Sequence, residues 1–335
     1  MNVFVHPNVI FLAGLVIITL GAEMLLRGAS RLAALLGIKP LIIGLTIVSI
    51  GTSVPELAVG IKAANEGRGS IAIGNIAGTN VINILFILGL SAAMRALPIQ
   101  LLSIKLDVPV MIASSLALIA MAWDGTLSQT EGAILVLSAV FYTIALIRFS
   151  RRESPSVQKE FAEEFGVAAI PKIDPAIPHA DAWPIPWSIL LFLVGMGLTL
   201  LGAELLVSGA TSIARVYGIS DAVIGLTIVA IGTSAPELAT TIIATMKNDR
   251  DVAVGNLIGS STYNILVILG LTCLSSPGGI AVAREILLFD LPIAALTAVA
   301  CFPIFKSDRM VSRKEGTIFV GAYILYLTSI LALRA

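Results

Sequence analysis

The stretch Gly44-Leu-Thr-Ile-Val-Ser-Ile-Gly-Thr-Ser-Val-Pro-Glu-Leu-Ala58 occurs again, with two substitutions, as Gly225-Leu-Thr-Ile-Val-Ala-Ile-Gly-Thr-Ser-Ala-Pro-Glu-Leu-Ala239. In each copy an apolar run typical of a membrane helix is interrupted by proline and glutamate. A proline inside a helix donates no backbone hydrogen bond and clashes with the carbonyl four residues earlier, so we expect both helices to be broken. Freed carbonyls, hydroxyls and one acid make each copy oxygen-rich and anionic, which indicates a site for a hard cation.

The composition around these copies is that of a membrane protein. Of the 335 residues, 57% are hydrophobic and 13% are charged, which is too apolar for a soluble core. The ten runs long enough to span a bilayer are 8–26, 40–64, 71–93, 104–123, 129–149, 186–207, 222–246, 252–274, 284–305 and 315–333. We therefore predict an all-α polytopic membrane protein with ten transmembrane helices. The first run has no basic start and no cleavage site, so we expect it to be retained as a span.

The chain is an internal duplication. When residue n is aligned with residue n+181, roughly half of the positions from Gly14 to Leu90 match without a gap. Each half contains five expected spans, and because five is odd the second half must enter the membrane from the opposite side. The sequence thus predicts two inverted five-helix repeats, residues 1–149 and 185–335, joined by a polar linker over 150–184. The two broken helices are then expected to meet near the membrane midplane.

The basic residues predict the orientation. Numbering the loops alternately puts all but five of the 21 Lys and Arg residues on one side of the membrane; the other side holds Lys62, Arg68, Arg215, Arg284 and Arg334. The basic side is expected to be cytoplasmic, with the linker on it and both termini outside. The formal net charge of zero gives no indication of a nucleic-acid partner.

Polar residues at helical spacing surround each proline. Thr52 and Glu56 are four residues apart and share a helix face, with Ser49 one turn below Thr52 or Ser53. The corresponding positions of the second copy, together with two polar pairs of the following spans, are Ala230, Thr233, Ser234 and Glu237, then Thr79 with Asn83 and Ser260 with Asn264. Carboxylates, hydroxyls, amides and freed carbonyls supply six or more oxygen ligands, the number that calcium takes.

The cost of burial favours ion binding. A carboxylate at the bilayer centre costs about 2.5–3.5 kcal/mol on the mildest scale, and two neighbouring carboxylates also repel each other. The alternative is that Glu56 and Glu237 are protonated and hold helices together through hydrogen bonds to hydroxyls. Two acids at equivalent positions of an inverted repeat favour the cation site.

Other chemistry-bearing residues form no catalytic set. Cys273 and Cys301 lie in apolar runs, and neither a nucleophile with its base nor a cofactor motif can be assembled, so we expect neither an enzyme nor a cofactor. Glu23 is expected to pair with Arg27, four residues on, near a span end. Asp107 and Asp290, each two residues before a proline, are expected to cap the helices that they begin.

At these residues the chain resembles the calcium/cation antiporter superfamily, and within it the prokaryotic sodium/calcium exchangers. The resemblance covers nearly the whole length. It is carried by Gly51-Thr-Ser-Val-Pro-Glu56 and Gly232-Thr-Ser-Ala-Pro-Glu237, each followed by Gly-Asn-x-x-Gly at Gly74–Gly78 and Gly255–Gly259. Some members with a potassium requirement have Asp where this chain has Asn264.

The resemblance implies the ligands. Glu56 and Glu237 would bind both calcium and sodium, and the carbonyls of Thr52 and Thr233 would complete the calcium shell. The sodium sites would use the carbonyls of Ser49 and Ala230, the hydroxyls of Ser53, Ser234, Thr79 and Ser260, and the amides of Asn83 and Asn264.

The resemblance also implies a mechanism. Calcium or sodium, but not both, would occupy the site, and the first and sixth spans would slide to expose it to one side or the other, in a prokaryotic inner membrane. Because only two acids are present, we expect exchange that moves net charge and needs no potassium. The rival functions are a proton/cation antiporter that uses the same glutamates as proton carriers and a cation channel.

Overall fold

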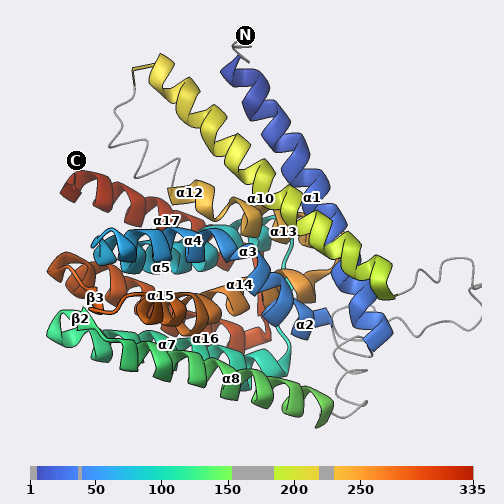
Figure 1. Cartoon of the computed structure of the whole chain (residues 1–335). Helices are drawn as coiled ribbons and strands as arrows, with labels where there is room; N and C mark the ends of the chain where they lie inside the picture. Colours follow the sequence, from blue (N-terminus) through green and yellow to red (C-terminus); the bar gives the residue numbers. More distant parts are fainter. Residues whose placement is uncertain (1–5, 37–39, 153–184, 219–229, 335) are drawn as a thin grey trace, which may run out of the picture.

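The computed structural model describes residues 6–36, 40–152, 185–218 and 230–334, and most of them are helical (Figure 1). The elements, in which η marks π-helical segments except the 3-10 turn η4, are α1 (Pro7–Leu36), α2 (Pro40–Ile43), η1 (Gly44–Val48), α3 (Ser49–Thr52), α4 (Val54–Asn65), α5 (Gly69–Val81), η2 (Ile82–Leu88), α6 (Gly89–Met94), β1 (Leu97–Pro98), η3 (Ser103–Asp107), α7 (Val108–Met121), η4 (Ala122–Asp124), β2 (Thr126–Leu127), α8 (Gln129–Arg152), α10 (Ile185–Val216), α12 (Ala230–Thr233), α13 (Ala235–Met246), α14 (Arg250–Tyr263), η7 (Asn264–Leu269), α15 (Gly270–Ser275), β3 (Ile280–Ala281), η8 (Ile286–Asp290), α16 (Leu291–Asp308), β4 (Met310–Val311) and α17 (Arg313–Arg334).

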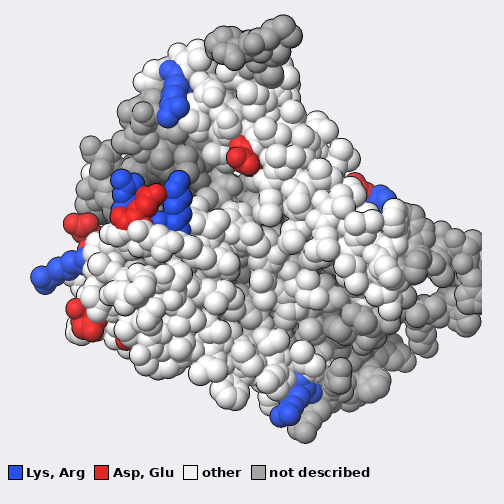
Figure 2. Space-filling model, in the orientation of Figure 1, with Lys and Arg blue, Asp and Glu red and all other residues white. Residues whose placement is uncertain are grey.

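The predicted helical membrane architecture is confirmed. Within the described ranges, seven helices are long and apolar enough to cross a membrane: Pro7–Leu32, Gly69–Met94, Ser103–Asp124, Gln129–Ser150, Ile185–Val216, Arg250–Ser275 and Ile286–Asp308. An eighth candidate is the pair Leu41–Thr52 and Val54–Asn65, bent by 43°. Most of the face in Figure 2 carries no charged side chain, as a lipid-facing surface requires.

The remaining expected segments are only partly described. Helix α17 covers the expected run 315–333, whereas the expected run 222–246 is described from residue 230 onward. The expected linker over 150–184 lies outside the described residues, apart from residues 150–152 at the end of α8. Residues 225–229 of the second motif also lie outside them.

In both copies of the motif the helix breaks at the serine that stands two residues before the proline. Ser53 has φ −85° and ψ 9°, and Ser234 has φ −86° and ψ 6°, so the two serines share one non-helical conformation. In each copy the proline then occupies the first turn of the next helix, α4 or α13, where its missing N–H is not needed. The predicted broken helices are therefore confirmed.

The core is built from the helices that follow the two motifs. In the spans Gly69–Met94 and Arg250–Ser275, 72% and 83% of the most apolar window is buried, against 33% and 28% in the spans of α1 and α10. Both inner spans are interrupted by a π-helical segment, η2 or η7, and such segments often mark functional sites. The inner pair thus forms the centre, and α1 and α10 lie outside it (Figure 1).

Two short antiparallel strand pairs tie the loops together. Leu97 and Pro98 pair with Val311 and Met310, while Thr126 and Leu127 pair with Ala281 and Ile280. Each pair joins a loop of the first half to a loop of the second half, so that loops far apart in sequence lie at the same end of the bundle.

The prediction that Asp107 and Asp290 cap helices is wrong. Each lies inside a longer helix, at the end of a π-helical segment, and neither makes a side-chain capping hydrogen bond. Asp107 instead accepts a hydrogen bond from the Tyr142 hydroxyl at 2.9 Å, and Tyr326 donates to Asp290 at 3.5 Å. The wider π-turn accommodates the Asp-x-Pro sequence without ending the helix.

Candidate ion-binding site

The two motif glutamates are fully buried in the membrane-spanning part of the protein. Glu56 and Glu237 are each 0% exposed and occupy the first turns of α4 and α13, where the positive end of the helix dipole favours a negative charge. They lie close enough for their charges to interact. Since two like charges repel each other in a buried site, the arrangement is favourable only if something neutralises them.

Several polar atoms around these glutamates make no hydrogen bond within the described residues. They are both carboxylate oxygens of Glu56, Oε2 of Glu237, both amide atoms of Asn83, Oδ1 of Asn264 and Oγ of Ser234. Buried polar atoms are nearly always paired, so each unpaired atom needs an explanation. A group of unpaired oxygens around two carboxylates is what a cation site provides.

Hydrogen bonds bring the two motifs together. The Ser53 hydroxyl donates to Oε1 of Glu237 at 3.3 Å, and the Thr52 hydroxyl also faces this carboxylate. On the other side, the Ser260 hydroxyl donates to the carbonyl of Ser49 at 3.4 Å. Residues of the first motif therefore contact residues from α13 and α14, as expected for broken helices that meet.

The asparagines of the π-helical segments complete the arrangement. Helix α4, with Glu56, packs against η7, which begins at Asn264, and α13, with Glu237, packs against η2, which contains Asn83. Thr79 is buried in α5, which packs against α12. Each glutamate helix thus contacts the asparagine segment of the other half.

The carbonyl of Ser49 is not left without a donor, contrary to the simplest form of the freed-carbonyl prediction. It accepts the backbone N–H of Ser53 at 3.1 Å and the Thr52 hydroxyl at 3.2 Å. The reason is geometric: Pro55 lacks the N–H that would reach Gly51, four residues earlier, whereas Ser49 keeps its partner. The Ser260 hydroxyl is a third donor to this oxygen, which has two lone pairs, so a cation bound here would have to displace a hydroxyl donor.

The remaining predicted ligands come from the second motif. Ser234 is buried, and Thr233 is half-buried at the end of α12. Ala230 begins α12; its side chain lies outside the described part of the structure, and its predicted role concerns the carbonyl.

Four polar residues that were not predicted as ligands support the site: Asn80, Thr240, Thr241 and Asn256. Asn256 donates to the hydroxyls of Thr240 and Thr241 at 3.0 and 3.2 Å and accepts from Thr52 at 3.4 Å. Asn80 bridges the inner helices, because it donates to the carbonyl of Ser261 at 2.9 Å and accepts from Asn264 at 3.1 Å. Asn256 belongs to the repeated Gly-Asn-x-x-Gly motif, so the repeat could have indicated its role. Asn80 could not be found in this way, because its counterpart in the second half is Ser261.

Glycines allow the inner helices to approach the first motif. A Cβ atom on Gly259 would lie 2.4 Å from the Leu45 carbonyl oxygen, and one on Gly255 would lie 2.8 Å from that of Leu41. Only glycine permits backbones this close. The two glycines of the second Gly-Asn-x-x-Gly therefore bring Ser260 within reach of Ser49.

A cavity of about 730 Å³ reaches the motifs from one side. It lies between α10 and the two broken helices, and its lining includes Pro55, Thr233, Glu204 and Ser208. The remaining walls are mostly apolar. This cavity therefore lies beside Pro55 and Thr233, which are close in sequence to the buried glutamates.

The donor set suits a hard cation. Within the described residues there is no group of three or more His, Cys, Asp or Glu side chains that could hold a metal. The site offers two carboxylates with neutral hydroxyl, amide and carbonyl oxygens, which calcium and similar hard ions prefer, and it has no imidazole or thiolate for a transition metal.

Comparison with known proteins identifies the family. The family described as sodium/calcium exchanger protein matches residues 6–148 and 187–332, which is most of the chain. The chain belongs to this family. Its members are transporters rather than enzymes, so the predicted resemblance and antiporter class are confirmed.

Individual relatives match over nearly their full lengths. The chain is 33% identical over 323 residues to the inner membrane protein YrbG of Escherichia coli, covering 95% of the chain and 94% of that protein. It is 30% identical over 339 residues to the sodium/calcium exchanger MaX1 of Methanosarcina acetivorans, covering 95% and 96%. Its structure is similar to that of the sodium-calcium exchanger NCX_Mj, with a TM-score of 0.78, 26% identity and coverage of 97% and 98%.

Proposed function

We propose that this protein is a secondary active antiporter that exchanges calcium for sodium across the membrane by alternating access. Family membership supports cation antiport, and two similar proteins are named as sodium/calcium exchangers. The ions are the transported substrates, and the mechanism uses neither hydrolysis nor a cofactor.

The observation that carries the proposal is the set of unpaired oxygens at Glu56, Glu237, Asn83 and Asn264. An ionised carboxylate in a buried site costs several kcal/mol unless a charge or strong hydrogen bonds compensate it. A divalent cation between Glu56 and Glu237 would neutralise both charges at once. The carbonyls of Thr52 and Thr233 would complete the calcium shell.

Sodium would use the same carboxylates with other neighbours. We assign to it the carbonyls of Ser49 and Ala230, the hydroxyls of Ser53, Ser234, Thr79 and Ser260, and the amides of Asn83 and Asn264. Because both ions need Glu56 and Glu237, they would exclude each other. Mutually exclusive occupancy is what couples the two fluxes in an antiporter.

The charge count predicts electrogenic exchange without potassium. Calcium neutralises the two glutamates, whereas the three sodium ions usual in the family would leave a single positive charge. Neither Asn83 nor Asn264 can balance that charge or serve an additional cation. The membrane potential would then act on the cycle by about 2.3 kcal/mol per 100 mV.

We further propose ten spans arranged as two inverted repeats, with the linker on the cytoplasmic side of a prokaryotic inner membrane. The matching backbone of Ser53 and Ser234 supports the repeat, as do the π-helical segments at equivalent places in both halves. The strand pairs support this topology. Each pair joins two loops that lie on the same side of the membrane when successive loops are assigned to alternate sides.

Calcium flux into vesicles tests the function. Purified protein is reconstituted in liposomes loaded with sodium, and calcium-45 uptake is followed with pH clamped on both sides and the voltage set by an ionophore. We expect uptake that requires the outward sodium gradient, responds to voltage and is unchanged by potassium. Uptake driven by a proton gradient alone would instead identify a proton/cation antiporter, and uptake without any counter-ion would identify a channel.

A further inference from the structure

Helices α1 and α10 form one rigid unit. Six glycines line their contact, and a Cβ atom on any of them would lie 2.3–2.6 Å from a backbone nitrogen of the other helix; they are Gly14, Gly21, Gly28, Gly195, Gly202 and Gly209. Contacts this close lock the two backbones together along most of their length. A sliding of one helix past the other would require many of them to separate, so the pair moves as a unit.

This pair is only loosely attached to the rest of the protein. Among the described residues, the main hydrophobic core contains no residue of α1 or α10. Three small clusters attach the pair instead: Leu25, Ala29, Leu32 and Phe192 pack on Ile43 and Val48; Leu26 packs on Ala244, Val252 and Ala253; Ile18 and Ala203 pack on Ala235. Within the described structure, the pair is therefore held to the rest of the protein by small apolar clusters and not by the main core.

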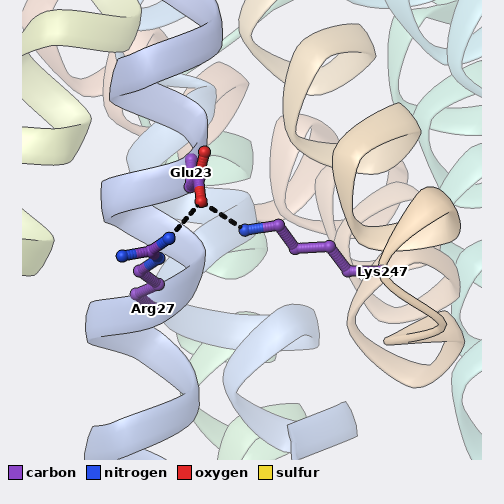
Figure 3. A network of polar contacts seen from close by, with 3 residues as sticks. All are labelled: Glu23, Arg27 and Lys247. Carbon is purple, nitrogen blue, oxygen red and sulfur yellow. Dashed lines mark hydrogen bonds and ion pairs between the residues drawn. The ribbon is translucent and has the colours of Figure 1, made fainter.

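Among the described residues, two neighbouring polar contacts join α1 to the segment that follows α13, and Figure 3 shows the first of them. Glu23 of α1 accepts a hydrogen bond from Lys247, just beyond α13, with Nζ and Oε1 2.7 Å apart, and it also pairs with Arg27 on its own helix. Two turns further along α1, the hydroxyl of Ser30 donates to Oδ2 of Asp249 at 3.1 Å. We call the contacts Glu23–Lys247 and Ser30–Asp249 the α1 latch.

The other helix of the pair lacks this arrangement. Glu204 of α10 corresponds to Glu23, but the positions that correspond to Lys247 and Asp249 are Glu66 and Arg68, so the same pairings cannot form. Glu204 instead lines the 730 Å³ cavity that reaches Pro55 and Thr233. It lies between Gly202 and Gly209, which contact Ile18 and Phe11, and so it is nearer the N-terminal end of α1 than Glu23 is.

We infer that the α1 latch holds the α1–α10 pair against the Lys247 end of α13 in one of the two access states, and that it must open in each transport cycle. The inference rests on the proposed antiport function. The latch is suited to repeated opening, because Glu23 and Lys247 side chains remain 32% and 43% exposed and such pairs are weak. Losing it should shift the balance of access states about two- to fivefold.

Reversible cross-linking tests the latch. Glu23 and Lys247 are replaced by cysteine in a chain carrying Cys273→Ser and Cys301→Ser. A short bis-methanethiosulfonate reagent then joins the two thiols through disulfides, with methanesulfinate as the leaving group, and a reductant cleaves the link. We expect calcium exchange in liposomes to fall at least tenfold and to return on cleavage, whereas equilibrium calcium binding in detergent changes less than twofold. The matched control joins Glu23→Cys to Arg27→Cys within α1, and cross-linking should leave its exchange rate the same as in that variant before cross-linking.

Single substitutions give a second readout. Lys247→Met removes the bridge and should change turnover two- to fivefold with little change in the calcium dissociation constant, while Lys247→Arg should behave like the parent protein. Arg27→Met removes the contact within α1 and should have less effect than Lys247→Met.

Undiminished exchange by the cross-linked pair, or failure of the two cysteines to cross-link, overturns the latch. Absence of sodium-driven calcium uptake in the parent protein before cross-linking is a different result, because it contradicts the proposed function itself.

Discussion

The two copies of the motif have the same backbone conformation at the serine where the helix breaks, but different hydrogen bonding. Ser53 and Ser234 differ by only 1° in φ and 3° in ψ. Yet Glu237 receives the Ser53 hydroxyl at 3.3 Å, whereas within the described structure both oxygens of Glu56 and the hydroxyl of Ser234 are unpaired. The repeated sequence thus determines the local fold of each copy, and the other half of the protein determines its chemistry.

This difference indicates that the two carboxylates depend unequally on a bound cation. Glu237 keeps one donor when no cation is present, and Glu56 has none from a side chain in the described residues. Glu56 should therefore be the less stable carboxylate in the ion-free protein and gain more when calcium binds.

The largest effect is expected from removing either charge. Glu56→Gln and Glu237→Gln should each reduce calcium exchange at least about 100-fold, since a lost buried charge partner costs about 3 kcal/mol or more. In ion-free detergent, Glu56→Gln should raise the thermal unfolding midpoint more than Glu237→Gln does. Flux assays and thermal unfolding measure the two effects, and near-normal exchange in either variant would falsify the site.

Restoring a backbone donor should have the next largest effect. Pro55→Ala or Pro236→Ala supplies an N–H that can bond the carbonyl four residues earlier and close the helix, so that the carboxylate moves from its position. We expect calcium affinity to fall about tenfold, equivalent to about 1.4 kcal/mol, in both variants. Calorimetric titration with calcium measures it; unchanged affinity in both would show that the helix break is unimportant.

A smaller and unequal effect is expected for the two serines. Ser53→Ala removes the donor that stabilises Glu237 in the ion-free protein. Like Glu56, this carboxylate should then gain more from a bound cation, so calcium affinity should rise about fivefold, the value of one hydrogen bond of about 1 kcal/mol. Ser234→Ala, its counterpart, removes no such bond and should change calcium affinity less than twofold. Equal effects of the two substitutions would contradict the asymmetry.

The smallest effect concerns an acid outside the membrane-spanning segments. Burial raises the pKa of Asp249, whose counterpart in the first half is Arg68, and the Ser30 hydroxyl partly opposes the rise. A raised pKa means that the folded protein binds this proton more tightly than the unfolded chain, so stability is lost as pH rises from about 4 through the folded pKa. Thermal unfolding should show the parent losing stability relative to Asp249→Asn over that range; a pH-independent difference would exclude this explanation.

The sequence predicted the features that depend on local pattern. The apolar runs were sufficient to predict the membrane helices. The duplication and the two Pro-Glu pairs were sufficient to predict the helix breaks near Ser53 and Ser234 and the family. The pairing of Glu23 with Arg27 was also predicted, because residues four apart share a helix face.

Features that depend on distant contacts could not be predicted. Asp-x-Pro indicates a helix start locally, but Asp107 lies inside a helix because a π-turn accommodates it and Tyr142, 35 residues away, supplies a donor. Lys247 reaches Glu23 across 224 residues, and Asn80 reaches Asn264 across 184. Such partners follow from the packing of the two halves and have no periodic signal.

The most direct test of the central claim is calcium-45 binding at equilibrium to the detergent-solubilised protein as sodium is increased. A site in which Glu56 and Glu237 hold either ion predicts that sodium displaces calcium completely and competitively, that potassium at the same ionic strength does not, and that Glu56→Gln binds no calcium. Calcium binding that persists at saturating sodium, or that survives Glu56→Gln, would contradict a single shared site.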